Sequence, residues 1–551
     1  MTTSTAQYSV IASEAKQSRH REKEIASAQT DAPRNDKRDL IIVFGLALIV
    51  RVAVAAFQAQ PGYMDAYYYT AGAQRLAGGF GFSDPYVWNY LDDPTSLPHP
   101  SHLYWMPLPS ILAALSMALF GSSFRAAQAP FVLLASIAPI IAYVVAWRVT
   151  AQRRAAWIAA WLMIFSGFYI PFWGLPESFA PYAVFGSLAL LLSNGRSTRS
   201  ALAAGVCAGL AHLTRADGLL LLVPVLLNAE LGMKNEGRPF LHSAFVVRRS
   251  SFVLLLGYLV VMLPWFLRNL AVVGSPLASA GMQTLWVCHY DEVFSFGVRL
   301  DVNHWLGCGI DRMAAAKLNG LASGLVHLIA ENGLIFAAPF MAIGLWRLRR
   351  ESIFRPVFVY LLLVYLAMTL AFTFVGDRGG LFHSSAALMP FLCAAAPVGL
   401  ERIVEAAVRR IQAWQFERAA RGFGLLIVVL ALALSIVVFA GRVIAADWNR
   451  ADAAYREVGA WLTDRGERDA VVMAGNPPGF TYHAGHPAIV LPNGDVETLL
   501  AAARRFGAKW VVLDQNYPQP LAALYSNPQL SPHLIPVATF GKTVLFEIGG
   551  K

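Results

Sequence analysis

Two acidic residues of this 551-residue chain stand where they could do chemistry. The first is Asp65, in the run Met-Asp-Ala-Tyr-Tyr-Tyr at 64–69, directly after the first long apolar segment. Partial burial among aromatic rings would raise the pKa of this carboxylate toward that of a useful general base. Such a base could take the proton of an acceptor hydroxyl. The alternative is that Asp65 only caps a helix expected over 66–76.

The second acid is Glu177, in the run Leu-Pro-Glu-Ser at 175–178. It falls between the third and fourth apolar runs, on the side of the membrane predicted for Asp65. As a functional group it would border the same cavity and orient an acceptor, hold a cation or bias the ionisation of Asp65. The alternative is an acid placed favourably at a helix N-terminus.

Four basic side chains are candidates for holding a phosphate. Arg215 follows a short apolar run and should lie recessed, either beside a lipid phosphate or in a local pair with Asp217. Arg268 ends the seventh run, where it could clamp a phosphodiester or extend to the lipid headgroups. Arg378 and His383, in the next short external turn, are similar candidates. No spacing of His, Cys, Asp and Glu predicts a metal site.

Composition places these residues in a membrane protein. Hydrophobic residues make up 56% of the chain and charged residues 14%, with a mean hydropathy of +0.50, whereas soluble domains carry about 25% charged residues. The net charge of +10 lies in short turns, which is an orientation signal and not a nucleic-acid footprint. Eleven apolar runs predict an α-helical multi-pass protein of about 11 spans: 40–57, 131–147, 155–170, 179–192, 201–213, 219–231, 252–267, 325–346, 357–375, 386–400 and 425–440.

The basic turns set the predicted orientation. Arg148, Arg153 and Arg154 form the first of several turns that should face the cytoplasm. The loop over 58–106 has one basic residue against four acids and should face outside. Since the loop over 58–106 and the basic turn at 148–154 should lie on opposite sides, the chain must cross the membrane an odd number of times between them. The run 131–147 supplies one crossing, so the apolar run 107–120 is predicted to be an interfacial or re-entrant helix. The N-terminus is then cytoplasmic and the C-terminus extracytoplasmic.

The predicted domains follow from this orientation. Residues 1–38 are a polar, disordered cytoplasmic tail, and 39–441 form the transmembrane domain, with external loops over 58–106 and 270–324. Residues 445–551 alternate short strands and helices, which predicts a small extracytoplasmic α/β domain. Its strands are expected at 470–474, 488–491, 510–514 and 543–548, its helices at 451–465 and 496–506, and a turn at 476–479.

Four cysteines are present. Cys207 and Cys393 lie in spans and are expected to be inert. Cys288 and Cys308 share an external loop, where a disulfide is possible but where spacing alone does not establish the geometry.

Taken in order, four segments resemble the GT-C superfamily of membrane glycosyltransferases, which includes protein mannosyltransferases and aminoarabinose transferases. The segments are 64–68, 175–178, 204–215 and 264–269. The resemblance covers roughly residues 40–400 and implies a GT-C-like bundle and a polyprenyl-phosphate-linked sugar donor used at the outer face. It matches Asp65 to the acid of the family's first external loop and Glu177 to the acid of the second.

The expected function is therefore an inverting transfer of a sugar, hexosyl or pentosyl, to a hydroxyl of a lipid, cell-envelope glycan or protein. Membrane lipids are partners and nucleic acid is not. The sequence identifies no definite cofactor, and it leaves a divalent cation open. A multi-pass transporter or lipid flippase is the alternative, which Arg51 inside the first span would favour. A non-catalytic scaffold is a third class.

Overall fold

The computed structural model describes residues 37–195, 197–231, 240–277, 279–411, 413–450 and 452–549. The tail predicted over 1–38 lies outside these ranges except for its last two residues, as do Arg196 and the basic turn over 232–239.

Among the described residues, six helices are long and apolar enough to cross a membrane. They are Lys37–Ala56, Phe124–Thr150, Arg249–Val273, Ile310–Asn332, Thr373–Val408 and Phe416–Asp464. Four shorter apolar helices accompany them: Leu108–Phe120, Phe179–Leu192, Ala216–Asn228 and Arg355–Ala371. The helical membrane class is thus confirmed, while the count of about 11 crossings stays a prediction.

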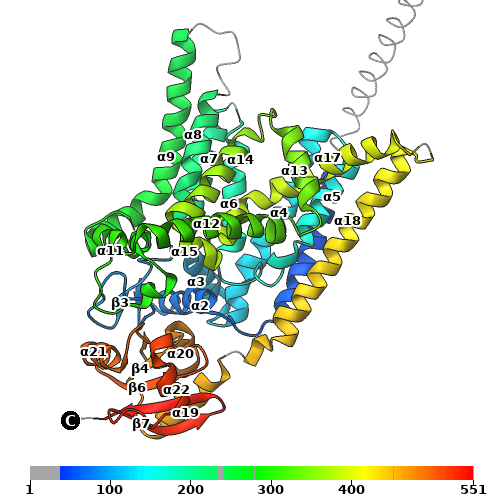
Figure 1. Cartoon of the computed structure of the whole chain (residues 1–551). Helices are drawn as coiled ribbons and strands as arrows, with labels where there is room; N and C mark the ends of the chain where they lie inside the picture. The colour runs from blue at the N-terminus through cyan, green and yellow to red at the C-terminus, as the bar shows by residue number, and fades with distance from the viewer. Residues whose placement is uncertain are drawn as a thin grey trace, which may run out of the picture.

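After Lys37–Ala56, the α-helices of six or more residues that precede the C-terminal domain follow in chain order (Figure 1). They are α2 (Met64–Ala77), α3 (Leu108–Phe120), α4 (Phe124–Thr150), α5 (Arg153–Ile164), α6 (Phe179–Leu192), α7 (Thr198–Thr214), α8 (Leu222–Leu231), α9 (Phe240–Val273), α11 (Val302–Gly307), α12 (Ile310–His327), α13 (Ala338–Leu348), α14 (Arg355–Leu366), α17 (Met389–Val408) and α18 (Phe416–Phe439). The helix predicted over 107–120 is α3. In Figure 1, α12 lies across the bundle, whereas α9 runs from top to bottom.

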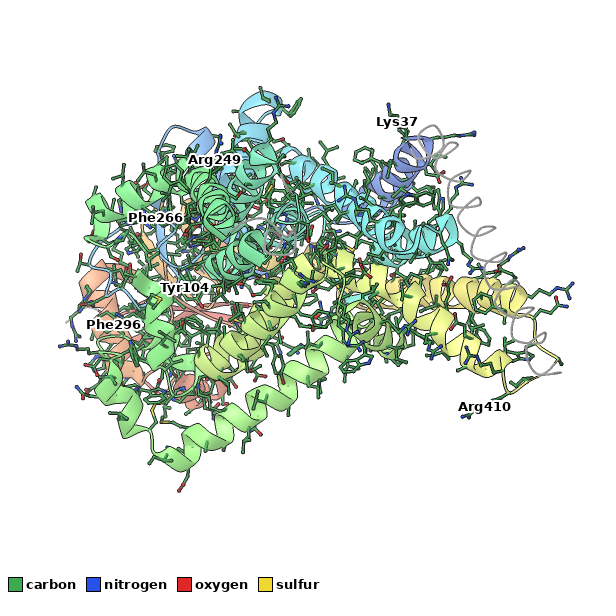
Figure 2. All side chains as sticks on the ribbon, turned by 90° about the horizontal axis from the view of Figure 1, so that it is seen from above. Lys37, Tyr104, Arg249, Phe266, Phe296 and Arg410 are labelled. Carbon is green, nitrogen blue, oxygen red and sulfur yellow. A yellow bond between two sulfur atoms is a disulfide. The ribbon has the colours of Figure 1, made fainter. Side chains whose placement is uncertain are left out.

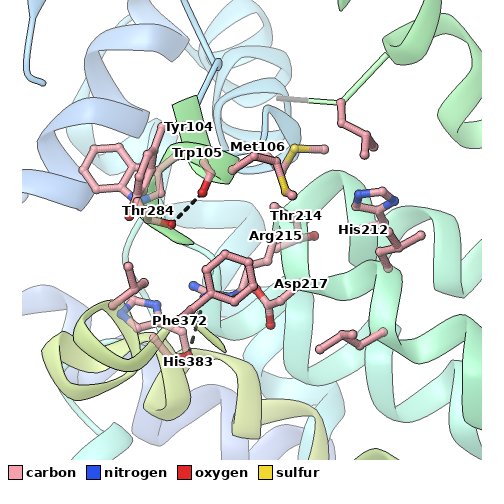
Figure 3. A pocket seen from close by; sticks show the side chains of 18 of the residues that line it. Tyr104, Trp105, Met106, His212, Thr214, Arg215, Asp217, Thr284, Phe372 and His383 are labelled. Atoms are coloured by element: carbon pink, nitrogen blue, oxygen red, sulfur yellow. Dashed lines mark hydrogen bonds and ion pairs between the residues drawn. The ribbon is translucent and has the colours of Figure 1, made fainter. Parts of the chain in front are cut away.

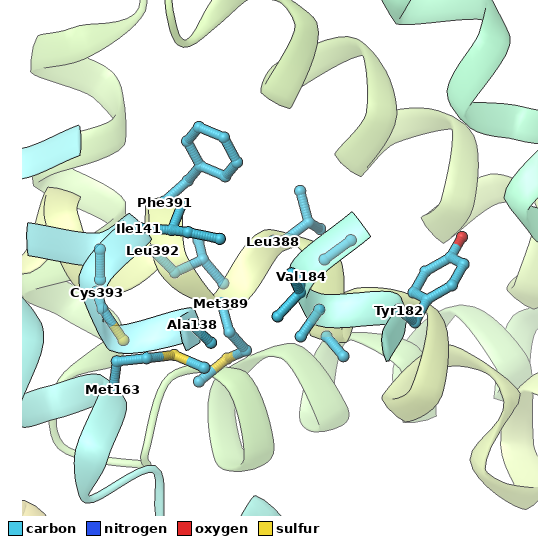
Figure 4. Close-up of a cluster of buried hydrophobic side chains, with 14 of the residues drawn as sticks. Ala138, Ile141, Met163, Tyr182, Val184, Leu388, Met389, Phe391, Leu392 and Cys393 are labelled. Carbon is cyan, nitrogen blue, oxygen red and sulfur yellow. The ribbon is translucent and has the colours of Figure 1, made fainter. Parts of the chain in front are cut away.

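The centre of the bundle is packed by apolar side chains of α4, α5, α6 and α17. Figure 4 shows Met389 of α17 surrounded by Ala138, Met163 and Val184, which come from the three other helices. All four side chains are buried. This core fixes the N-terminal ends of α6 and α17. Glu177 lies just before α6, and His383 lies in the short helix α16 (Leu381–Ser384) that precedes α17.

Helices α7 and α9 approach each other through glycine. A Cβ atom added at Gly205 would clash with the carbonyl oxygen of Leu254, and one added at Gly257 would lie 2.5 Å from the carbonyl oxygen of Leu202. Small residues at such positions let helix backbones pack closely inside a membrane. This contact places Arg215, just after α7, beside the end of α9.

We expect Gly205→Ala to lower the free energy of unfolding by about 1–3 kcal/mol, because the added methyl group forces α7 away from α9. Gly422→Ala is the matched control, since an added Cβ in α18 meets nothing within 4 Å. Thermal unfolding of both variants in detergent measures the difference. Equal stability of the two variants would contradict the close approach.

The C-terminal domain contains most of a six-stranded sheet with the order β2-β5-β4-β6-β8-β7. Its strands are β4 (Val471–Ala474), β5 (Ala488–Val490), β6 (Ala508–Leu513), β7 (Leu534–Phe540) and β8 (Thr543–Ile548). The helices α19 (Ala453–Asp464), α20 (Pro477–Ala484) and α21 (Val496–Phe506) connect or precede them. The four predicted strands and two predicted helices are confirmed to within a few residues, and β7 was not predicted.

The edge strand β2 (Tyr86–Val87) comes from the loop over 58–106, the first loop predicted to be external, and pairs in parallel with β5. Two short strands of the same loop, β1 (Ser83–Asp84) and β3 (His99–Pro100), pair with each other. The Tyr67 hydroxyl lies 2.8 Å from His483 Nε2 of α20. The sheet is therefore attached to the loop that carries Asp65.

The turn predicted over 476–479 was wrong, because α20 begins there. Asn476 is its N-cap and accepts a hydrogen bond from the amide of Gly479 (3.1 Å), while Pro477 occupies the first helical position. Proline is favoured at that position, where the missing N–H costs nothing. Residues 476–479 therefore begin a helix, although their sequence is also typical of a turn.

The loop over 270–324, the second loop predicted to be external, lies against the same sheet. The amide of Asn493, after β5, donates a hydrogen bond to the carbonyl oxygen of Phe294 (2.9 Å). A disulfide joins Cys288 and Cys308, so the pairing that spacing left open is made in the structure. Cys207 and Cys393 are free.

Candidate active site

A cavity of about 470 Å³ lies where the loops over 58–106 and 270–324 meet the membrane helices. Four of the six predicted site residues line it: Asp65, Arg215, Arg378 and His383. Figure 3 shows Arg215, Asp217 and His383 around this hollow, with Tyr104 and Trp105 at another part of its wall. Its volume is typical of a small-molecule site.

The cavity is charged in one part and apolar in the rest. Its apolar wall comes mainly from α9, from the segment after it, and from the region between α14 and α17. That wall includes Trp265, Phe266, Leu277, Met282, Leu285, Met368 and Phe372. Such a division suits a molecule with a polar head and a hydrocarbon tail.

Asp65 lies in the first turn of α2. The N-cap of this helix is Tyr63, and no side chain caps it, so Asp65 is not the helix cap that local sequence allowed. Its half-buried carboxylate instead borders the cavity. The positive end of the helix dipole still favours an acid at this position.

Glu177 lies behind His383 and is not among the residues that line the cavity. Its Oε1 is 3.2 Å from His383 Nδ1, and its Oε2 accepts a hydrogen bond from the amide of Phe179 (3.0 Å). The Ser178 hydroxyl is 3.0 Å from Glu177 Oε1 and 3.0 Å from His383 Nδ1. The buried Glu177 carboxylate thus orients the ring of His383, which faces the cavity.

The two carboxylates ionise differently. Burial, and then the negative charge of Glu177, raise the pKa of Asp65 to about 6. Burial also opposes ionisation of Glu177, but His383, then Arg215 and the Phe179 amide outweigh it and hold its pKa below the usual value. Pairs of acids whose pKa values are driven apart commonly divide the roles of proton acceptor and fixed charge.

Arg215 follows α7 and points into the same site. Its Nε donates to Asp217 Oδ1 (2.9 Å), so the local pair considered from the sequence is present. The guanidinium also reaches Ser178 Oγ (3.5 Å) and Ser384 Oγ (3.4 Å). Because Arg215 also lines the cavity, the pair and the phosphate role are compatible, and Asp217 fixes the direction of the guanidinium.

The remaining two arginines differ in position. Arg378 lines the cavity with its guanidinium 5.2 Å from the ring centroid of Tyr290. Arg268 is not among the lining residues. Its Nη2 donates to the carbonyl oxygen of Ser101 (2.9 Å) and its Nη1 to Asn269 Oδ1 (3.0 Å). The guanidinium of Arg268 therefore ties the first external loop to the end of α9.

Asp65, Glu177 and His383 could hold a metal ion, because one ligand atom from each lies within 4.8 Å of the others. Two carboxylates and an imidazole form a donor set that suits divalent cations such as Mn²⁺ or Zn²⁺. A cation bound there would supply positive charge beside a developing anion. The three residues are far apart in the sequence, so no spacing motif could have predicted that they form a group.

Tyr290 is a site residue that the sequence analysis missed. It lines the cavity from the second external loop and lies close to the guanidinium of Arg378. The only available signal was its place in an external loop with Asp291 and Glu292. Arg51, the charged residue inside the first predicted span, is buried and donates a hydrogen bond to the carbonyl oxygen of Met163 (3.0 Å).

No family model and no curated protein matches the chain. Several solved structures, however, match the chain. The oligosaccharyltransferase AglB of Archaeoglobus fulgidus, in complex with an inhibitory peptide and a dolichol-phosphate, aligns over 87% of this chain and 69% of its own, with 14% identity and a TM-score of 0.56. ArnT of Cupriavidus metallidurans bound to undecaprenyl phosphate aligns over 93% and 99%, with 14% identity and a TM-score of 0.58.

A third similar structure is the arabinofuranosyltransferase AftD from Mycobacteria. It aligns over 94% of this chain and 42% of its own, with 14% identity and a TM-score of 0.50. These three structures are GT-C glycosyltransferases, and the chain has their fold. The resemblance seen in the four sequence segments is confirmed at the level of the fold.

Proposed function

We propose that this protein transfers a sugar from a polyprenyl-phosphate-linked donor to an acceptor hydroxyl at the outer face of the cell (inner) membrane. One observation carries the proposal: an acid with a raised pKa and two arginines face one cavity that has an apolar wall, in a GT-C fold. Two similar structures bind a dolichol-phosphate and an undecaprenyl phosphate. The same type of lipid is the proposed donor carrier here.

In this proposal, the isoprenoid lies along the apolar wall and the phosphate lies between Arg215 and Arg378. Both guanidinium groups belong to the cavity, and a fork of donors matches phosphate oxygens. His383 could donate a further hydrogen bond while Glu177 holds its ring. Arg268 is a weaker candidate, because it is not among the residues that line the cavity and its guanidinium contacts a backbone carbonyl and Asn269.

Asp65 is the proposed catalytic base. The acceptor O–H loses its proton to the Asp65 carboxylate as the oxygen attacks the anomeric carbon. A new C–O bond forms on one face of the sugar while the C–O bond to phosphate breaks on the other, which inverts the anomeric configuration. The electron pair stays on the departing phosphate. Arg215 stabilises the charge that develops there, a kind of contribution that is often the largest in catalysis.

Charge placement supports the proposed orientation. Arg153 binds Asp39 at the start of the first helix, and Arg154 bridges Glu401 and Glu417. Figure 2 views the molecule from the end where Lys37, Arg249 and Arg410 lie, and Figure 1 places the C-terminal sheet at the other end. Positive residues favour the cytoplasmic side. We therefore assign the N-terminus to the cytoplasm, keep about 11 crossings, and place the C-terminal domain outside.

The proposal is tested with purified protein, a labelled polyprenyl-phosphate sugar and candidate acceptors in detergent. We expect labelled product and free polyprenyl phosphate in equal amounts, and NMR of the product should show an inverted anomeric centre. A flippase would instead move the intact lipid across proteoliposomes without releasing polyprenyl phosphate. That second outcome would overturn the enzymatic assignment.

The pH profile gives a separate prediction. The base acts only when ionised, so kcat/KM should fall about tenfold per pH unit below the pKa of Asp65 and level off above it. Because that pKa is raised to about 6, the midpoint is expected near pH 6 and not near the ordinary carboxylate value of 3.8. Steady-state rates between pH 4.5 and 8, about two units around the midpoint, check this. A flat profile across that range would contradict it.

A further inference from the structure

The second loop predicted to be external brings together four side chains that can ligate a metal, away from the cavity described above. They are Cys288, Glu292, His304 and Cys308. His304 Nε2 lies 3.6 Å from Cys288 Sγ and 3.1 Å from Glu292 Oε2. One ligand atom from each of Cys288, His304 and Cys308 lies within 4.8 Å of the others.

The disulfide between Cys288 and Cys308 does not explain why the side chains of His304 and Glu292 lie beside it. A structural disulfide needs no imidazole or carboxylate in contact with its sulfur atoms. Here the His304 ring and the Glu292 carboxylate are largely buried beside them, with side-chain exposures of 28% and 12%. The cysteine Cα atoms are 6.1 Å apart, a spacing within the disulfide range and short enough for both sulfurs to reach one ion.

The backbone holds these side chains in place. Asp301 Oδ1 accepts hydrogen bonds from the amides of Asn303 (2.9 Å) and His304 (3.1 Å), which fixes the start of α11. Glu292 Oε2 accepts a hydrogen bond from the amide of Cys288 (2.6 Å). Such outer contacts orient metal ligands and strengthen binding in known metal sites.

An ion could reach the cluster, because all four side chains line a cavity of about 420 Å³. Arg312 and Lys317 line the same cavity. Two thiolates, one carboxylate and a divalent cation carry a net charge of −1, and these two cations more than offset that negative charge. The cluster is thus electrostatically suited to a thiolate-bound metal.

We propose that the reduced form of this loop binds Zn²⁺ through Cys288, Cys308, His304 and Glu292. A dithiol reduces the disulfide by two electrons and two protons, and the dithiol is itself oxidised to a disulfide. Zn²⁺ then binds the two sulfurs, and two protons are released. Two sulfurs, one imidazole nitrogen and one carboxylate oxygen make a four-coordinate donor set that zinc accepts.

Both states would hold the same loop segment closed. The disulfide and the metal each join residue 288 to residue 308, and Tyr290 lies between them, against Arg378 of the first cavity. The loop would therefore keep its shape in either redox state. This inference stands on the loop geometry and does not depend on the proposed transferase activity.

The test uses the full-length protein in detergent, treated with a dithiol, freed of metal and titrated with Co²⁺ as a spectroscopic substitute for Zn²⁺. We expect about one Co²⁺ per chain, a sulfur-to-cobalt charge-transfer band and tetrahedral d–d bands, with displacement by Zn²⁺. The oxidised protein should show none of these. Reduced protein that gives no thiolate band would overturn the proposal.

Variants separate the four ligands from their surroundings. His304→Ala and Glu292→Gln should each weaken Zn²⁺ binding by at least about tenfold, since even outer contacts are worth that much. Asp311→Asn, at an exposed acid just after the loop segment and outside this cavity, should bind as the parent does. Thiol titration of the oxidised variants should find the disulfide intact, which shows that the loop is folded. Parent-like affinity in both ligand variants, or an equal loss in Asp311→Asn, would overturn the donor set.

Discussion

Asp65→Asn is expected to lower kcat by about 100- to 10,000-fold, the usual contribution of a general base. Asparagine has nearly the same shape but cannot accept the proton of the acceptor hydroxyl. Binding of the lipid donor should remain, because the arginines that face the cavity are unchanged. The measurement is transfer of labelled sugar under single-turnover conditions, together with the equilibrium affinity for polyprenyl phosphate.

Asp93→Asn is the matched control for this variant. Asp93 lies in the same external loop, its side chain is 74% exposed, and it pairs with Arg505 on the C-terminal domain. We expect its activity to stay within about twofold of the parent, because an exposed ion pair is worth little. Near-parental transfer by Asp65→Asn would remove the base from the proposed mechanism.

Arg215→Gln should lower kcat by about 100- to 1,000-fold, which corresponds to about 2.7–4 kcal/mol of transition-state stabilisation. The guanidinium is directed into the site by Asp217 and lines the cavity. Its charge is most valuable when the sugar–phosphate bond breaks and negative charge grows on the phosphate. Arg215→Lys should restore part of the rate, because an ammonium keeps the charge but not the fork of donors.

Variants of two further arginines serve as comparisons for Arg215→Gln. Arg75→Gln removes a half-buried arginine that binds Ser83 outside the cavity, and we expect parental rates from it. Arg268→Gln should mainly lower thermal stability, since its guanidinium binds the carbonyl oxygen of Ser101. A larger loss of donor affinity in Arg268→Gln than in Arg215→Gln would exchange the roles assigned to the two residues.

Local pattern predicted much of the fold. The helix over 496–506 matches α21 to the residue, and the strand at 543–548 matches β8. Both segments have strong periodicity and clear ends, such as the N-cap Asp495 and the left-handed Gly507 after α21. The edge strand β2 could not be predicted, because two residues carry no period and its partner lies about 400 residues further along the chain.

The candidate site likewise contains residues that could be predicted from the sequence and arrangements that could not. Residue type and position in external turns identified Asp65, Arg215, Arg378 and His383, which the structure brings to one cavity. The position of Glu177 behind His383 required coordinates, because the two residues are 206 positions apart and meet only when α6 and α17 pack. The contact between Tyr290 and Arg378 depends equally on the fold.

The sequence by itself determined that this is a helical membrane protein with a small C-terminal α/β domain, since hydropathy and side-chain period act over neighbouring residues. It also predicted which acids and basic residues are candidates for the site. Only the tertiary structure decided that Asp65 faces the cavity while Glu177 lies behind His383, and that β2 joins the C-terminal sheet. Those arrangements come from contacts between distant segments, and the burial and charge that separate the two carboxylates arise only when the segments are packed together.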